Sequence, residues 1–181
     1  VLKSQTLYTR KHFNEVLDRL NEKRNKIQVI AGPRQVGKTT LIDQVLAKVT
    51  IPYTLSKADG VNPKDFGWIH RTWDSVRGLM KIRHEETHLL VIDEIQKIDQ
   101  WSEGVKAEWD WDTHNGLDIK LILLGSSRLM LQSGLKESLA GRFELIRMGH
   151  WSFKEMSEAF GLSPDEYIYF GGYPGSAGFI N

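Results

Sequence analysis

The feature that most constrains this chain is a loop at residues 32–39 with the sequence G-P-R-Q-V-G-K-T. An apolar run at residues 27–31 precedes it and is short enough for a buried strand. Apolar side chains within residues 41–46 recur at helical spacing after it. The pattern G-x-x-x-x-G-K-T between a strand and a helix is typical of a phosphate-binding loop. The sequence therefore predicts a phosphate site where this strand turns into this helix.

The residue types in the loop suit a bound nucleotide. Glycine lets the backbone curl so that successive N–H groups point at phosphate oxygens, and the following helix offers its N-terminal N–H groups to the same anion. Lys38 reaches the β- and γ-phosphates, and the Thr39 hydroxyl is a ligand for Mg²⁺. A glycine-rich turn that only packs is the alternative. The residues expected to bind the nucleotide are Gly32, Pro33, Arg34, Gln35, Val36, Gly37, Lys38, Thr39 and Thr40.

The composition is that of an ordinary globular domain. The 181 residues are enough for one sizeable core, and the net charge of +1 provides no field that would recruit nucleic acid or a membrane surface. The chain has no cysteine, which excludes disulfides and thiolate chemistry. No apolar run approaches the length of a membrane span, and no secretory signal precedes the domain. We therefore expect a cytoplasmic protein without a membrane partner.

Strand-like and helix-like segments alternate along the chain. Further strands are predicted at residues 51–55, 89–92, 119–124 and 143–148, with helices between them, including one at 129–139 that is broken by a glycine. This alternation predicts an α/β fold with three layers, in which helices cover both faces of a central, mostly parallel five-stranded sheet. Ligands in such sheets bind at the carboxyl ends of the strands.

Segments at both ends of the chain are expected to pack on this core. Residues 1–26 contain an amphipathic helix, whose basic side chains, including Arg10 and Arg24, are interpreted as a solvated face rather than a contact with nucleic acid or an acidic partner. Residues 27–150 form the core, with Trp73 in a packed helical stripe rather than in a base-stacking site. The segment after it contains two helices that begin with capping boxes, S-F-K-E and S-P-D-E.

A pair of acidic residues follows the third predicted strand. Asp93 comes directly after the apolar residues 89–92, where a phosphate-loop protein places the aspartate that organises Mg²⁺. Glu94, beside it, can orient and polarise a water in line with the γ-phosphate, which favours hydrolysis. Ser126 and Ser127 end the next strand and can hydrogen-bond the γ-phosphate or that water, with helix capping as the alternative. We expect the loop, the acidic pair and the serines to meet at one edge of the sheet.

Two other motifs receive no functional role. Residues 84–88 spell H-E-E-T-H, a zinc-protease pattern that works only on a helix, but His88 adjoins a predicted strand. Residues 96–99, Q-K-I-D, weakly resemble the guanine-reading pattern N-K-x-D, but they directly follow the strand that ends at Asp93, where a GTPase does not place them. Adenine is therefore favoured over guanine, and the expected cofactors are ATP and Mg²⁺.

With these residues in place, the chain resembles the AAA+ superfamily of P-loop ATPases. It is most similar to a prokaryotic family whose ATPase core precedes a poorly characterised C-terminal domain. The resemblance implies a P-loop NTPase sheet of the ASCE type, and it spans nearly the whole chain. It rests on G-P-R-Q-V-G-K-T-T at 32–40, L-L-V-I-D-E-I-Q-K at 89–97, L-L-G-S-S-R-L-M-L at 123–131, E-S-L-A-G-R at 137–142, S-F-K-E-M at 152–156 and G-G-Y-P at 171–174.

The resemblance implies roles for individual residues. The phosphate loop and the acidic pair take the Walker roles, and one of the two serines takes the sensor role. Arg142 precedes the last predicted strand, where AAA+ proteins commonly place an arginine finger, worth about 10³ to 10⁵ in rate. Supplied by a neighbouring copy, this finger would tie hydrolysis to oligomerisation; a structural salt bridge is the alternative. The expected catalytic residues are Glu94, Lys38, Ser127, Ser126 and Arg142, with Thr39 and Asp93 as Mg²⁺ ligands.

An AAA+ module normally continues into a helical lid, whereas this chain ends shortly after the G-G-Y-P motif. We therefore expect the lid to be largely absent, with residues 151–181 forming the start of a lid or a connection to a missing C-terminal domain. The favoured function is an ATP-hydrolysing domain that drives a conformational change in a C-terminal region or in a protein or nucleic-acid partner. A slowly hydrolysing ATP-gated switch or interaction module, a nucleic-acid remodelling ATPase and a small-molecule kinase remain alternatives.

Overall fold

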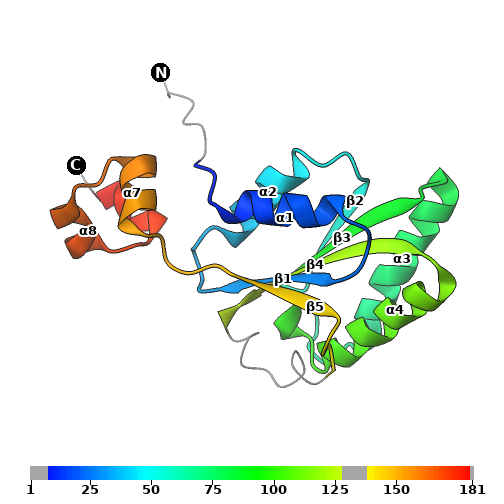
Figure 1. The fold of residues 1–181 in the computed structure, drawn as a ribbon. Helices are drawn as coiled ribbons and strands as arrows, with labels where there is room; N and C mark the ends of the chain where they lie inside the picture. Colours follow the sequence, from blue (N-terminus) through cyan, green and yellow to red (C-terminus); the bar gives the residue numbers. More distant parts are fainter. Residues whose placement is uncertain (1–7, 128–137, 180–181) are drawn as a thin grey trace.

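The computed structural model describes residues 8–127 and 138–179 (Figure 1). No helix in these two ranges is long and apolar enough to cross a membrane. The elements are α1 (His12–Asn21), β1 (Ile27–Gly32), α2 (Lys38–Leu46), β2 (Tyr53–Lys57), α3 (Gly67–Arg83), β3 (Thr87–Asp93), α4 (Trp101–Asn115), β4 (Asp118–Ser126), β5 (Phe143–Arg147), α7 (Phe153–Phe160) and α8 (Pro164–Phe170), with the 3₁₀ helices η1 (Ile95–Lys97) and η2 (Pro174–Phe179).

The five strands form one sheet in the order β2-β3-β4-β1-β5, and every pairing is parallel. The predicted α/β sheet is thereby confirmed. Strands of a parallel sheet are covered by helices on both faces, which explains why β1, β3 and β4 read as continuous apolar runs. β2 and β5 lie at the edges of the sheet and are correspondingly more exposed.

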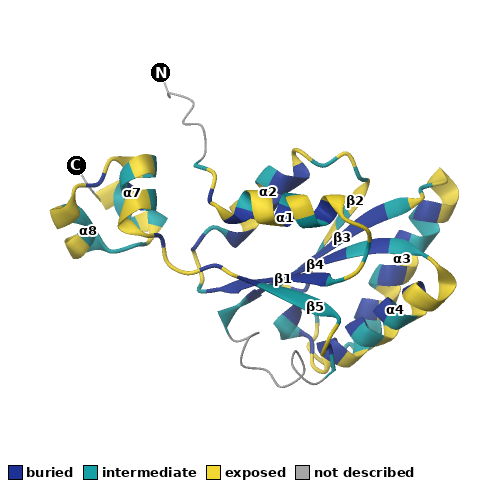
Figure 2. Cartoon of the chain, in the orientation of Figure 1, coloured by how far each residue is buried: buried dark blue, intermediate teal, exposed yellow. Residues whose placement is uncertain are grey.

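Helices on both faces of the sheet give the molecule three layers (Figure 1). α1 and α2 pack on one face and α3 and α4 on the other, and each pair buries its own apolar cluster (Figure 2). Neighbouring strand residues point to opposite faces, so that Ile30 belongs to the first cluster while Val29 and Ala31 belong to the second. Trp73 of α3 is fully buried in the second cluster, which confirms its predicted packing role.

Two predicted elements differ from the structure or lie outside it. The sequence predicts the second strand at residues 51–55, whereas β2 covers Tyr53–Lys57. Pro52 lies just before the strand, where its carbonyl accepts the Leu89 N–H at 2.8 Å; proline can supply this acceptor but has no N–H for the ladder. The predicted helix at 129–139 falls almost entirely outside the described residues.

The basic residues that flank α1 are buried in part, and their interpretation as a solvated face is wrong for two of them. Arg10 lies before the helix and is only 5% exposed. Arg24 follows the helix, lies 3.5 Å from the centre of the Trp109 ring, and donates to the carbonyls of Trp109 and Ile119 at 2.9 Å each. A guanidinium can be buried in this way because carbonyl and carboxylate oxygens satisfy its five N–H donors.

After β5 the chain leaves the sheet and forms a small helical unit of α7, α8 and η2 (Figure 1). Ser152 and Ser163 open its two α-helices, and both make the complete capping box that the sequence predicts. Near its end the unit folds back on Trp151: the Trp151 N–H donates to the Gly172 carbonyl at 2.9 Å. A Cβ at Gly172 would lie 2.2 Å from the Trp151 carbonyl oxygen, so this contact requires glycine.

Candidate nucleotide-binding site

The carboxyl ends of β1, β3 and β4 meet at one edge of the sheet and carry the predicted site residues. Gly32, the last residue of β1, pairs directly with Ser126, the last residue of β4. Asp93 ends β3, which pairs with β4 on the side of β4 that faces away from β1. The parallel register therefore brings the phosphate loop, the acidic pair and the serines together, as the sequence predicts.

The loop between β1 and α2 has the backbone geometry of an anion site. Gln35 and Gly37 have positive φ angles of 63° and 90°, and such left-handed residues let successive N–H groups converge on an anion. α2 begins at Lys38, so its first N–H groups have no carbonyl partner one turn earlier. Gly32 is required for a packing reason, because a Cβ there would lie 2.0 Å from the Met148 carbonyl oxygen. The loop therefore offers N–H donors and a helix N-terminus to the same point.

Lys38 is held across the loop by its own backbone. Its ammonium group donates to the carbonyl oxygens of Gly32 at 3.0 Å and Pro33 at 2.6 Å. Burial lowers the pKa of Lys38, although the charges of Glu94 and Asp93 act in the opposite direction. A buried ammonium group is stabilised by a bound anion, so Lys38 favours a phosphate at this position.

The acidic pair follows β3 in a sharp turn. Asp93 Oδ1 accepts the Glu94 N–H at 2.9 Å. Burial raises the pKa of Asp93, although this hydrogen bond from Glu94 opposes the rise. Glu94 itself has a φ of 55°, a conformation that non-glycine residues adopt at a cost and that clusters at functional sites.

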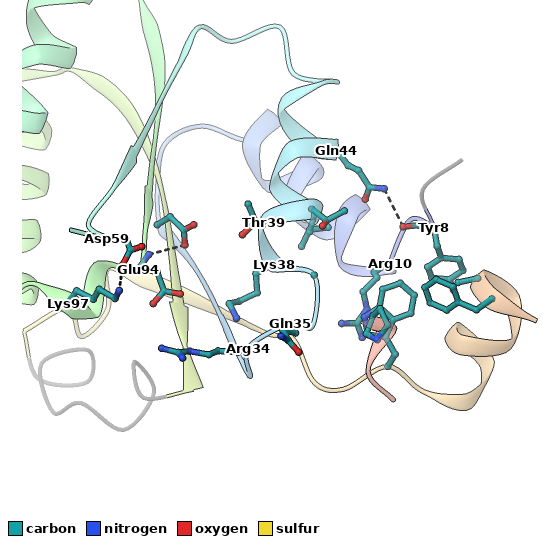
Figure 3. A pocket seen from close by; sticks show the side chains of 18 residues that line it. Tyr8, Arg10, Arg34, Gln35, Lys38, Thr39, Gln44, Asp59, Glu94 and Lys97 are labelled. Carbon is teal, nitrogen blue, oxygen red and sulfur yellow. Dashed lines mark hydrogen bonds and ion pairs between the residues drawn. The ribbon is translucent and has the colours of Figure 1, made fainter. Parts of the chain in front are cut away.

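These groups line one end of a cavity of about 620 Å³ (Figure 3). Its size is within the range of roughly 300–1,000 Å³ that is usual for small-molecule sites. Thr39 and Thr40, at the start of α2, also line it. Lys97 and Asp59 form an ion pair on the same side as Glu94 (Figure 3). This end of the cavity is therefore charged and rich in backbone donors.

The other end of the cavity is aromatic and comes from both ends of the described chain. The Tyr8 and Phe160 rings lie 5.3 and 5.7 Å from the Trp151 ring, measured between ring centres. The Trp151 indole N–H donates to the Val36 carbonyl at 3.0 Å and thereby joins this end to the phosphate loop. Gln44 of α2 lines the same end and donates to the Tyr8 carbonyl at 3.2 Å. Neighbouring aromatic side chains of this kind suit a planar ligand ring.

Arg10 connects the loop to the C-terminal helices. It donates to the Val36 carbonyl at 3.2 Å and pairs with both carboxylate oxygens of Glu155, at 2.9 and 3.2 Å. Burial on its own would raise the pKa of Glu155, but the hydrogen bonds from Arg10 and from Ser152 outweigh it and lower the pKa. The Val36 carbonyl therefore accepts two hydrogen bonds. One comes from Arg10 in the N-terminal segment, and the other comes from Trp151, just before α7.

Comparison with known proteins decides the family. A family model described as an AAA domain matches residues 24–157 of the chain. The chain belongs to this AAA domain family. An uncharacterised protein of Methanocaldococcus jannaschii is 27% identical to it over 168 residues, which cover 83% of this chain. The chain spans only 36% of the length of that relative.

The solved structures that resemble this AAA domain support the same fold. Two single-residue variants of RuvB from Thermotoga maritima match 83% of the chain, and 47% of each RuvB chain, at 18% identity. Their TM-scores are 0.56 and 0.55, which shows a shared fold. The predicted α/β P-loop fold and the predicted membership of the AAA+ superfamily are both confirmed.

Next to the phosphate loop, the AAA domain has a second depression that contains the serines. It is lined by Glu94, Gln96, Ser126 and Ser127, and Arg34 lines both this depression and the cavity. The serines therefore lie on the Glu94 side of the loop. Their role as sensors of the γ-phosphate stays a prediction.

Arg142 lies just before β5, at the end of the strands opposite to the phosphate loop. Its carbonyl accepts the N–H of Ile27, the first residue of β1, whereas the phosphate loop follows the last residue of that strand. Its guanidinium pairs with both carboxylate oxygens of Asp110, at 2.7 and 2.9 Å. This position excludes contact with the nucleotide cavity of the same chain. A finger supplied to a neighbouring copy stays a prediction.

The two motifs that received no role lie apart from the aromatic end. His84 follows the last residue of α3 and caps the helix with a φ of 55°, while His88 is buried in β3 between Glu85 at 2.7 Å and Thr54 at 2.9 Å. Residues 96–99 begin within η1 and are separated from Glu94 by Ile95 alone. In residues 8–127 and 138–179, no group of three or more His, Cys, Asp or Glu could hold a metal ion.

Sequence reasoning missed the whole aromatic end of the site. No local pattern marks Tyr8, Arg10, Trp151 or Phe160, and Arg10 is 145 positions from its partner Glu155. One signal was available: a tryptophan and a capping box follow β5 closely, which places an aromatic side chain at the carboxyl edge of the sheet, where ligands bind.

Proposed function

We propose that this AAA domain binds ATP and hydrolyses it in the presence of Mg²⁺. The observation that carries the proposal is that a phosphate loop, an acidic pair and an aromatic cluster line one cavity of about 620 Å³. A nucleoside triphosphate has an anionic end and a planar end that match these two kinds of lining. Membership of the AAA domain family supports nucleotide binding independently of this geometry.

The chemistry of the lining gives the nucleotide an orientation. The phosphates lie on the loop, where Lys38 exchanges its contacts with two carbonyls for β- and γ-phosphate oxygens. The base lies at the aromatic end, where stacking on a ring such as that of Tyr8 or Trp151 contributes roughly 1–3 kcal/mol. Residues 96–99 lie at the phosphate end beside Glu94, so they cannot read a base in this orientation, which supports adenine.

Thr39 and Asp93 are the residues that would hold Mg²⁺. Both line the cavity. One hydroxyl and one carboxylate, completed by phosphate oxygens and waters, form a donor set that Mg²⁺ accepts. The pKa of Asp93 supports the fit, because burial raises it and a nearby cation would restore the ionised form. When bound, Mg²⁺ neutralises charge that develops on the phosphates.

Glu94 is the residue proposed to activate water. Its carboxylate accepts a hydrogen bond from the water and orients it toward the γ-phosphate, and such a positioned base contributes typically about 10²- to 10⁴-fold in rate. Ser126 or Ser127 donates a hydrogen bond to a γ-phosphate oxygen or to the same water. Both serines line the depression that also contains Glu94.

The output of the site is proposed to reach the C-terminal helices. Trp151 and Arg10 both donate to the Val36 carbonyl in the loop, and Arg10 pairs with Glu155 of α7. A nucleotide that changes the loop conformation therefore acts directly on α7. On this proposal residues 27–150 are the ATPase core, and residues 151–181 begin a lid or a connection to a further region, which acts on a protein or nucleic-acid target.

The same contacts favour a second candidate, a switch that binds ATP tightly and hydrolyses it rarely. The loop is attached to α7 through Val36, so occupancy of the site alone can alter the helices. Single-turnover measurements on the full-length protein separate the two candidates. A bound-ATP lifetime of hours favours the switch, and a lifetime of seconds favours a cycling ATPase.

The hydrolysis proposal is tested with Glu94→Gln in the full-length protein. The variant keeps the size of the side chain but removes the base, so kcat for Mg-ATP should fall about 10²-fold or more. Its Kd for ATP, measured by calorimetry, should change by less than about threefold, since the ligand makes its main contacts with the loop.

The matched control is Glu86→Gln, which makes the same change at an exposed position between α3 and β3. It should leave both kcat and Kd at the wild-type values. Equal turnover of wild type and Glu94→Gln would refute the assignment of Glu94. If the wild-type protein fails to bind ATP at millimolar Mg-ATP, the proposed function as a whole is refuted.

A further inference from the structure

Gln96 lies two positions after Glu94. The turn of the backbone between them directs the Gln96 side chain back toward the Glu94 carboxylate. Glu94 adopts the left-handed conformation with φ 55° and ψ 34°, and η1 begins at the next residue. The Lys97 N–H donates to the Glu94 carbonyl at 3.0 Å, which closes the turn. Ile95 is fully buried and anchors η1 on the core. The position of Gln96 is therefore fixed by packing and by backbone hydrogen bonds.

The amide of Gln96 contacts the two groups to which the proposed function assigns chemistry. Its Nε2 donates to Glu94 Oε2 at 2.5 Å and lies 3.4 Å from Ser126 Oγ. Ser126 in turn pairs through its backbone with Gly32, where the phosphate loop starts. Gln96 therefore links the ends of β3 and β4 across the edge of the sheet.

The remaining amide oxygen of Gln96 points to a function rather than a packing role. Oε1 is buried and accepts no hydrogen bond from the described residues. Leaving a buried acceptor unpaired costs roughly 1–3 kcal/mol. An apolar side chain would fill this space without that cost, so the amide indicates a role beyond packing.

The Glu94 carboxylate depends on this amide. In the described part of the chain, no other side chain donates a hydrogen bond to it. A carboxylate on a freely rotating side chain presents its oxygens to a water in many directions, and only a few of these suit an in-line attack. A donor on Oε2 fixes the plane of the group and leaves Oε1 for the water.

We infer that Gln96 is a positioning residue for ATP hydrolysis: it orients the Glu94 carboxylate and couples it to Ser126. The inference rests on the proposed function, since it assigns no role to Gln96 in a protein that does not hydrolyse ATP. It adds a residue outside the phosphate loop, the acidic pair and the serines.

The first experiment measures kcat and the Kd for ATP in Gln96→Met and Gln96→Asn of the full-length protein. Methionine keeps the length of the side chain without the donor, and asparagine keeps the amide but is one methylene short of Glu94. Both should lower kcat about 10- to 100-fold, as is usual when a partner that orients a reacting group is lost. The Kd should stay within about threefold, because the Gln96 amide bonds Glu94 and Ser126 rather than the phosphate loop.

The matched control is Gln100→Asn, which makes the same change at an exposed residue that precedes α4. Gln100 has a φ of 54°, a conformation that asparagine tolerates, so the control should leave kcat and the melting temperature unchanged. Comparison of melting temperatures also identifies any loss of folding in the Gln96 variants.

The second experiment separates positioning from a structural role. In a Glu94→Gln background, Gln96→Met should lower turnover by less than about twofold, because the group that it orients is already gone. In Gln96→Glu a second carboxylate replaces the donor and repels Glu94, so kcat should fall at least as far as in Gln96→Met.

The outcomes are distinguishable from one another. A wild-type protein that binds Mg-ATP but does not turn it over refutes the proposed hydrolysis and this inference with it. An active wild type whose Gln96 variants keep the wild-type kcat, or exceed it, refutes only the role of Gln96. Additive losses in the double variant also refute it, because they show that Gln96 acts independently of Glu94.

Discussion

The two ends of the nucleotide cavity are built in different ways. The phosphate end uses short, continuous stretches of chain: the loop between β1 and α2, and Asp93 and Glu94 after β3. The aromatic end uses side chains from opposite ends of the described chain, with Tyr8 beside Trp151 and Arg10 bonded to Glu155. Both ends line the same cavity, but only the first is visible as a motif.

On the proposed function, the difference follows from which part of the nucleotide each end recognises. Phosphates are bound mainly by backbone N–H groups, which point the right way only if glycines and a helix start occur at fixed spacings. A planar base is held by stacking, which any of several aromatic side chains can supply from any element that reaches it. Substitutions at the two ends should therefore differ in size and in kind.

The largest effect is expected for Lys38→Ala at the phosphate end. Loss of the buried ammonium group should raise the Kd for Mg-ATP about 10²-fold or more and so abolish binding at ordinary concentrations. The fold should remain, since among the described residues the ammonium group hydrogen-bonds the Gly32 and Pro33 carbonyls and no side chain of the core. Calorimetry measures the Kd, and circular dichroism the melting temperature. The matched control is Lys48→Ala, at an exposed residue just beyond α2. An unchanged Kd for Lys38→Ala would contradict the proposed orientation of the nucleotide.

A smaller effect is expected for Trp151→Phe at the aromatic end. The variant keeps a ring but removes the indole donor to the Val36 carbonyl, so the free energy of unfolding should fall by about 1 kcal/mol. The Kd for ATP should rise by about three- to tenfold, because the ring loses its fixed orientation.

Trp73→Phe provides the comparison for that prediction. It removes an equivalent buried donor, which bonds Asp112 at 2.9 Å on the face of the sheet covered by α3 and α4. Its loss of stability should be at least as large, because a hydrogen bond to a carboxylate is worth more than one to a carbonyl, whereas its Kd for ATP should match the wild type. Equal Kd values for the two variants would show that the aromatic end does not bind the base.

Glu155→Gln tests whether the ion pair with Arg10 attaches α7 to the N-terminal segment. The measurement is the dependence of stability on pH. The pKa of Glu155 lies below its ordinary value of 4.5, so the ionised form stabilises the folded chain. This contribution is complete above about pH 4.5 and is lost as the pH falls through the lowered pKa. The difference in melting temperature between wild type and variant should therefore be present at pH 7 and shrink below pH 4.5. A difference that stays constant with pH would contradict the ion pair with Arg10.

The smallest effect on nucleotide binding is expected for Arg142→Ala, far from both ends of the cavity. Its pair with Asp110 is partly exposed, so the loss of stability should be about 0–1 kcal/mol. The Kd should not change. We expect turnover to fall only in an assembled form, where the residue can reach a neighbouring copy. An equal fall in a demonstrated monomer would refute the trans finger.

Sequence patterns predict the fold better than they predict the site. Periodicity locates all five strands, most clearly β1, β3 and β4, because their burial on both faces leaves long apolar runs. The one clear error in position is at β2, an exposed edge strand. The phosphate end is predictable because its chemistry depends on backbone. Arg10 and Arg24 could not be interpreted correctly, since a charged residue beside a helix is usually solvated, and their partners Glu155 and Trp109 are distant in sequence.

The two hydrogen bonds that the Val36 carbonyl accepts limit how far the protein can be shortened. A fragment cut to residues 24–157, the range that matches the AAA family, would begin after Arg10. It would keep the complete phosphate loop, yet Val36 would retain one donor and Glu155 would lose its cation. Boundaries for expression of a minimal domain are therefore better placed before Tyr8 than at the edge of the recognisable homology.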